Sequence, residues 1–110
     1  MVKIVAHAVI GIAQLKVFNE ASDSQVIVKK VLVGLPGEPK HQAIAQEFQI
    51  APSQQKTVDL TATIVKLLGG NAKGSIEVLV QFGQDTPAPA APSIYLCQTA
   101  NGRVAEFRSA

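Results

Sequence analysis

Residue types that mark several protein classes are scarce in this chain. Its 110 residues include one cysteine, Cys97, one tyrosine and no tryptophan, and aromatic residues make up only 5% of the total. A single cysteine excludes an intrachain disulfide framework and a cluster of thiolate ligands for a metal ion. We therefore expect Cys97 to be a small, half-buried apolar residue of a strand, without catalytic chemistry.

Charge is equally sparse. Charged residues amount to 16% of the chain, against roughly 25% in ordinary globular domains, and the net charge is only +2. The cations, eight of which are lysines, are spread along the sequence, whereas a nucleic-acid-binding face needs them clustered. No apolar run approaches the roughly 20 residues of a membrane span. We expect neither a nucleic acid nor a membrane as a partner.

The beginning of the chain needs a separate test, because an apolar stretch follows Lys3. His7 and Gly11 interrupt that stretch, and no small-residue cleavage site with a polar spacer comes after it. A secretory signal peptide is therefore not expected. The default prediction is a cytoplasmic, reducing location, which also suits the single cysteine.

The chain does carry a strong β-strand signal. In residues 75–82, Ile76, Val78 and Val80 point one way and Glu77 points the other, which is typical of a strand with one face in a core. Similar short runs, separated by turn residues, occupy 3–10, 15–19, 25–35, 56–60, 93–98 and 103–108.

Turn residues predict how these strands connect. The polar segment 19–24 predicts a hairpin between the strands before and after it. A slip in the apolar phase at Gly11 indicates a β-bulge or a strand break. Asn101 and Gly102 are the favoured pair for a two-residue hairpin turn, because both residue types tolerate positive φ.

One helix is predicted, over Thr61–Leu68, because its apolar residues fall on one face. Thr61 can cap its start and Gly69 can end it. A helix this short needs packing to hold it, so we expect it to plug one end of the β core. Residues 46–50 fit a further strand, although residues 42–47 also fit a helical turn.

About seven strands and one short helix predict a single domain, residues 1–110, with an all-β, mainly antiparallel, immunoglobulin-like two-sheet β-sandwich. The chain lacks the paired cysteines and core tryptophan of true immunoglobulin domains, so the prediction concerns the architecture and not the family. A partly open β-barrel is the alternative. Alternating proline and alanine predict an extended connector at residues 85–92, ahead of a C-terminal hairpin at residues 93–108.

No motif for catalysis or ligand binding stands out. No serine lies in a Gly-x-Ser-x-Gly turn, and the two histidines, His7 and His41, lack the spacing of a metal site. The glycine-rich segment 69–75 lacks the lysine that a phosphate-binding loop carries after its last glycine. We therefore predict no enzyme, no cofactor, and no catalytic, cofactor-binding or metal-binding residue.

Several strand segments are apolar on both faces, which a two-layer sandwich of this size does not need for its core. We therefore predict a non-enzymatic interaction module that self-associates as a homo-oligomer and can also bind a protein partner. The outward apolar residues expected at the interface are Ile27, Leu32, Leu79 and Tyr95. The alternative is a small-ligand-binding or adaptor domain with a pocket at one end of the sandwich. The polar contacts of that pocket would come from His7, Gln46, Glu47 and Tyr95.

Overall fold

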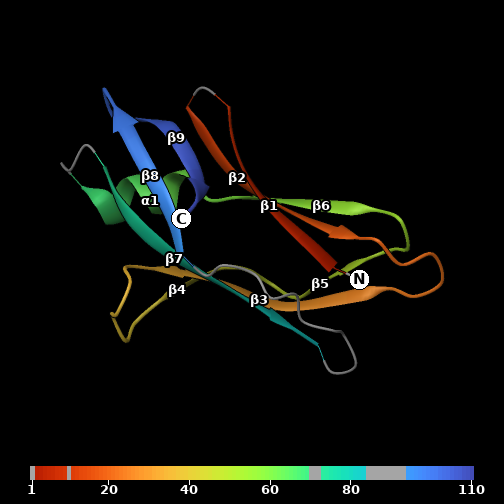
Figure 1. Ribbon diagram of the computed structural model, residues 1–110. Helices are drawn as coiled ribbons and strands as arrows, with labels where there is room; N and C mark the ends of the chain where they lie inside the picture. Colours follow the sequence, from red (N-terminus) through yellow and green to blue (C-terminus); the bar gives the residue numbers. More distant parts are fainter. Residues whose placement is uncertain (1, 10, 70–72, 84–93) are drawn as a thin grey trace.

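The described part of the chain folds into two antiparallel β-sheets with one short helix (Figure 1). The computed structural model describes residues 2–9, 11–69, 73–83 and 94–110, and in the first of these segments it describes only the side chains of Lys3 and Ala6. The elements are β1 (Val2–Val9), β2 (Ile12–Asn19), β3 (Val26–Gly34), β4 (Gln42–Ala45), β5 (Phe48–Ile50), β6 (Gln55–Asp59), α1 (Thr61–Leu68), β7 (Lys73–Phe82), β8 (Ile94–Ala100) and β9 (Arg103–Ser109).

The two sheets have different sizes. The smaller sheet has the strand order β1-β2-β6, and the larger has the order β4-β3-β7-β8-β9, with β5 also pairing with β3. The predicted two-sheet β-sandwich is confirmed, and the sheets do not close into the barrel that was the alternative. The finer likeness to immunoglobulin domains stays a prediction. No helix in the described part of the chain has the length and apolar character needed to cross a membrane.

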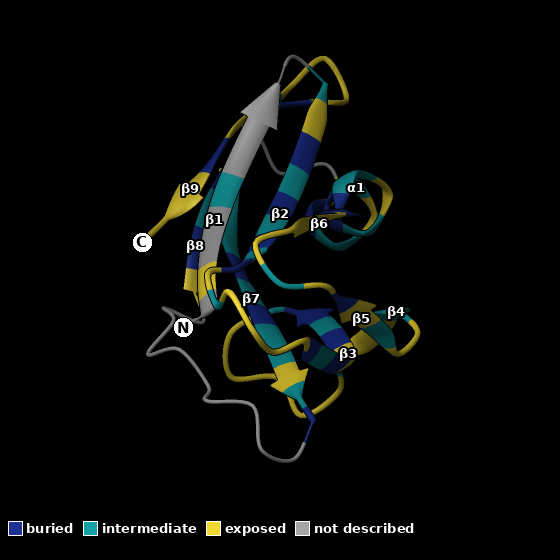
Figure 2. Ribbon diagram, turned by 90° about the vertical axis from the view of Figure 1, so that its right-hand side faces the viewer, coloured by how far each residue is buried: buried dark blue, intermediate teal, exposed yellow. Residues whose placement is uncertain are grey.

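The core lies between the sheets and is almost entirely aliphatic. Along β2 buried and half-buried residues alternate, so the apolar side chains of one face point inward (Figure 2). Burying one such valine or leucine contributes about 1.5–3 kcal/mol relative to leaving it in water. Side chains that are fully enclosed include Leu15, Val17, Val28, Val31, Val33, Leu60, Ile64, Ile76 and Val104.

Helix α1 bridges the two sheets. It contacts β2 of the smaller sheet and β3, β7 and β9 of the larger one, and its buried residues are Ile64 and Leu68. The predicted helix is confirmed at the predicted bounds, but Thr61 is not its N-cap, which is Leu60. Instead, the Thr61 hydroxyl accepts the backbone N–H of Ala13 at 2.9 Å and donates to the Asp59 carboxylate at 2.6 Å. Thr61 therefore ties the start of the helix to β2.

The predicted hairpin across residues 19–24 is wrong, because β2 and β3 belong to different sheets. The cause is Asn19, which is only 2% exposed. Its Nδ2 donates to the carbonyls of Ser24 and Ile50 at 2.8 and 3.0 Å, and its Oδ1 accepts the backbone N–H of Ala21 at 3.0 Å. These bonds hold the segment as a crossover between the two layers.

Other local predictions have mixed outcomes. The hairpin turn at Asn101 and Gly102 is confirmed, with φ of 54° and 76°. Gly11, at φ 79°, lies in the turn between β1 and β2, so the phase slip is a strand break. The helical turn considered for residues 42–47 is wrong, because β4 and β5 both pair with β3 as extended strands. The predicted proline- and alanine-rich connector, residues 85–92, lies outside the described residues.

Replacing Asn19 tests the crossover directly. Asn19→Ala should lower the free energy of unfolding by about 2 kcal/mol, because it removes the buried amide that donates to the carbonyls of Ser24 and Ile50. Urea denaturation measures the change. The control, Gln49→Ala, removes an exposed amide from β5 and should shift the free energy by less than about 0.5 kcal/mol. Equal stability of the two variants would contradict this account of the crossover.

Candidate interaction surface

The outer face of the larger sheet carries an unusual pair of leucines. In the β3–β7 register Leu32 lies opposite Leu79. Their chain neighbours Val31, Val33 and Val78 are buried in the core, so the strand alternation turns both leucines away from it. Directly opposed side chains of this kind have Cβ atoms about 4.5–5.5 Å apart and form one continuous apolar surface. Both leucines are only partly buried.

Neighbouring strands extend this surface. On β4, Ala43 is the register partner of Leu32 and is exposed. On β8, Ile94 is 38% exposed and is the register partner of Glu77, two residues before Leu79. We call Leu32, Ala43, Leu79 and Ile94 the outer apolar face. Its members come from four adjacent strands, in the order β4-β3-β7-β8.

Ile27 also points outward but is partly covered. It is half-buried on β3, and the backbone N–H of Gly83 donates to its carbonyl at 2.8 Å. Gly83 comes so close that an added Cβ there would lie 3.0 Å from the Ile27 Cβ. Of the predicted interface residues, Leu32 and Leu79 are therefore the two that the structure places side by side on the outer face.

A histidine and a glutamate close one end of the outer apolar face. The imidazole of His41 lies against Gly34, where an added Cβ would come within 2.7 Å of the ring. Its Nε2 is 3.5 Å from Oε1 of Glu77, and the His41 side chain is only 9% exposed. Within the described residues this buried Nε2 has no hydrogen-bond partner. The only signal for this close packing in the sequence is a glycine at the end of a valine-rich strand.

Lysines mark the opposite end of the face. The sequence predicts that Lys29 and Lys30 point to opposite faces, but a register shift between Val28 and Lys30 leaves both exposed. Lys29 pairs with Glu47 at 2.8 Å. Lys30 lies opposite Gln81 on β7 and forms no ion pair among the described residues.

The prediction that Tyr95 faces outward is wrong. Tyr95 is 2% exposed and stacks on Phe107 with ring centroids 5.2 Å apart. Desolvation raises the pKa of the Tyr95 hydroxyl. The residues on both sides of Tyr95, Ile94 and Leu96, are also apolar, so either phase of this strand satisfies the sequence pattern. Cys97, which was expected to be half-buried in a strand, lies in β8 as predicted but is buried more deeply, with 3% exposed, and burial raises the pKa of its thiol.

The residues suggested for a pocket at one end of the sandwich do not converge. Gln46 and Glu47 are exposed in the link between β4 and β5, whereas Tyr95 is buried on β8, beyond β3 and β7 in the sheet. The backbone of His7 pairs with Gln14 in the smaller sheet, and the side chain of His7 lies outside the described residues.

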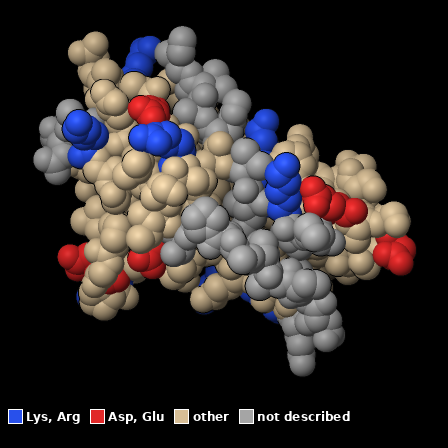
Figure 3. Space-filling model, in the orientation of Figure 1, with Lys and Arg blue, Asp and Glu red and all other residues tan. Residues whose placement is uncertain are grey.

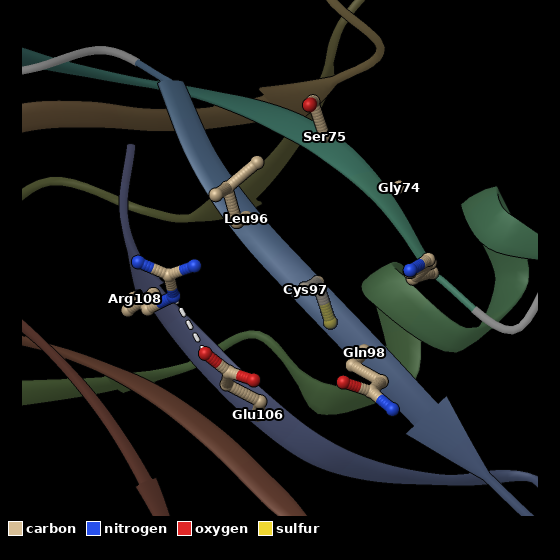
Figure 4. A pocket seen from close by; sticks show the side chains of 8 residues that line it. Gly74, Ser75, Leu96, Cys97, Gln98, Glu106 and Arg108 are labelled. Atoms are coloured by element: carbon tan, nitrogen blue, oxygen red, sulfur yellow. Dashed lines mark ion pairs between the residues drawn. The ribbon is translucent and has the colours of Figure 1, made fainter.

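A shallow hollow of about 310 Å³ lies elsewhere, on the outer face of β7, β8 and β9 (Figure 4). Its lining residues are Lys73, Gly74, Ser75, Leu96, Cys97, Gln98, Glu106 and Arg108. Glu106 and Arg108 form an ion pair at its rim, and both side chains are about half exposed. Sequence reasoning did not select these residues, because their alternation on the outer side of two strands resembles an ordinary solvated face.

The charges on the surface are mixed in sign. Figure 3 shows basic and acidic side chains interspersed over the visible face, without a broad area of one sign. Within the described ranges no three His, Cys, Asp or Glu side chains are grouped closely enough to hold a metal ion. No protein-family model, curated protein or solved structure matches this chain. The outer apolar face therefore has to be interpreted from its own residues.

The packing of His41 on Gly34 can be tested by a double-mutant cycle. Gly34→Ala should lower the free energy of unfolding by about 1–3 kcal/mol, because the new methyl group overlaps the imidazole ring. In a His41→Ala background the ring is absent, so the same substitution should have a much smaller effect. Urea denaturation of the four proteins measures both steps. An equal effect of Gly34→Ala in both backgrounds would show that the ring does not rest on Gly34.

Proposed function

We propose that this domain is a non-enzymatic interaction module that associates with a second copy of itself through the outer apolar face. The observation that carries the proposal is the pairing of Leu32 with Leu79 on the side of the sheet away from the core. Antiparallel sheets with one solvated face normally carry polar residues there. Burying a fully exposed leucine contributes about 1.5–3 kcal/mol, and Leu32 and Leu79, which are already partly buried, would each gain the part of this that belongs to their remaining exposed surface.

Two of the four sheet edges, β4 with β5 and β6, disfavour edge-to-edge pairing with another copy. On one edge of the larger sheet, β4 and β5 are short and offset by a register shift. On the smaller sheet the edge strand β6 has five residues, of which Lys56, Thr57 and Asp59 are exposed. Short, bulged and charged edges discourage the addition of another strand. A different protein that carries a matching apolar surface would use the same outer apolar face.

A second candidate function rests on the hollow beside β8. It offers two cations, Lys73 on β7 and Arg108 on β9, the second of which is paired with Glu106, and Leu96 lies between them on β8. This combination suits a small molecule with an anionic group and a short apolar part. The pocket would then lie on a face of the larger sheet, and not at the end of the sandwich.

Leu79→Glu tests the primary proposal. We expect the wild-type chain to show a mass above the 11.6 kDa of one copy at high protein concentration, measured by size-exclusion chromatography with light scattering. The variant should dissociate about a hundredfold more readily, because the interface would bury an unpaired carboxylate. Its circular dichroism should stay that of the wild type, since position 79 faces away from the core.

The matched control is Thr57→Glu, which places the same carboxylate on exposed β6 and should leave the assembly unchanged. An assembly that Leu79→Glu leaves intact would contradict the proposal, as would a wild-type chain that stays at the mass of one copy. If that single copy also gained thermal stability from a small anionic ligand, and Lys73→Ala removed the gain, the second candidate function would be favoured.

A further inference from the structure

We infer that two copies pack face to face with their β7 strands running in opposite directions, so that Lys30 of each copy pairs with Glu77 of the other. This arrangement rests on the proposed self-association and specifies its geometry. It follows from where the two charges lie relative to the leucine pair. Lys30 and Glu77 share the outer face of the larger sheet but lie on opposite sides of the row formed by Leu32 and Leu79.

The two charges cannot satisfy each other within one copy. Lys30 is in register with Gln81, and Glu77 is in register with Gly34, so four residue positions along the strands separate them. At about 3.4 Å per residue this separation is about 14 Å. The leucine row lies midway between them. Each copy therefore presents a cation on one side of the leucines and a carboxylate on the other.

A two-fold axis that lies in the interface, crosses the strands and passes through the leucine row brings these charges together. Rotation about this axis places the Leu32–Leu79 pair opposite the same pair of the second copy. It also places Lys30 of each copy opposite Glu77 of the other. Because a two-fold contact is isologous, the pair forms twice. Packed sheets lie about 10 Å apart, a gap that an extended lysine and glutamate span together.

The other two-fold arrangement leaves the charges apart. An axis parallel to the strands places Lys30 opposite Lys30 of the second copy, and Glu77 opposite Glu77 of the second copy. Each carboxylate then again lies about 14 Å along the strand from the nearest Lys30. Electrostatic complementarity therefore selects the reversed arrangement, and it sets the register of the contact as well as its strength.

Both Lys30 and Glu77 are accessible on this face. Lys30 is exposed, and the ion pair with Glu47 is formed by its neighbour Lys29. The Glu77 side chain is 23% exposed, and Nε2 of His41, whose ring lies on Gly34, is 3.5 Å from its carboxylate.

A charge-exchange experiment tests the pairing. Lys30→Glu and Glu77→Lys should each raise the dissociation constant of the homodimer about tenfold or more, because each puts like charges together twice per dimer. An equimolar mixture of the two variants should form a heterodimer with approximately wild-type affinity, since every contact again joins opposite charges. The chain that carries both substitutions should likewise recover its homodimer. One variant carries a tag that increases its mass, so that light scattering distinguishes the heterodimer from the two homodimers.

Further variants control for the change in net charge and for unfolding of the chain. Lys66→Glu on α1 and Glu20→Lys in the segment between β2 and β3 change the net charge by the same amount at exposed positions away from the outer face of the larger sheet, and they should leave the dimer unchanged. If a lysine beside His41 unfolds the chain, Glu77→Gln replaces it. That neutral variant should weaken the homodimer about threefold, and its mixture with Lys30→Glu should assemble more tightly than Lys30→Glu alone.

The outcomes separate the geometry from the proposed function. If the wild type self-associates and Leu79→Glu disrupts it, but the charge variants have no effect or their mixture does not recover, the reversed arrangement is overturned and self-association stands. If the outer apolar face captures only a different protein, the wild type does not self-associate, and both the arrangement and the proposed self-association are overturned. If the wild type stays a single copy, or Leu79→Glu changes nothing, both the proposed function and the arrangement fail.

Discussion

The structure depends on the alternation of side chains along β3 and β7. These two central strands of the larger sheet must point Val31, Val33 and Ile76 inward to build the aliphatic core. Because successive side chains of a strand point to opposite faces, the same geometry forces Leu32 and Leu79 outward. The register then sets the two leucines side by side. A shift by one residue would bury them but expose the core valines, so the outer apolar face is a direct consequence of the core.

The two ends of that face are built by local irregularities. The register shift in β3 allows Lys29 to reach Glu47, while Lys30 lies exposed on the outer side without an ion pair among the described residues. At the other end Gly34 leaves room for His41, whose ring borders the carboxylate of Glu77. A regular strand with a side chain at position 34 could not produce this asymmetry. The face is therefore a polarised surface, with an apolar centre, a cation at one end and a carboxylate at the other.

Local features of the fold could be predicted from the sequence, and long-range ones could not. The hairpin turn at Asn101 is determined by backbone preferences of two adjacent residues, and it appears as expected. The crossover at Asn19 depends on the carbonyl of Ile50 in β5, which is distant in the sequence, so the local sequence alone predicted a hairpin. Tyr95 lies in an apolar run that fits either phase of a strand. The outward direction of Leu79 was predictable from alternation, whereas its pairing with Leu32 required the strand order.

The most direct test of the central claim is a dilution series followed by the methyl resonances of a labelled sample. If copies associate through the outer apolar face, the methyl signals of Leu32 and Leu79 should shift with protein concentration. Those of the enclosed Leu15 and of Ile12, which is 38% exposed on the smaller sheet, should stay constant. Signals of Leu32 and Leu79 that do not move over the whole range, or a shift confined to Ile12, would contradict the account.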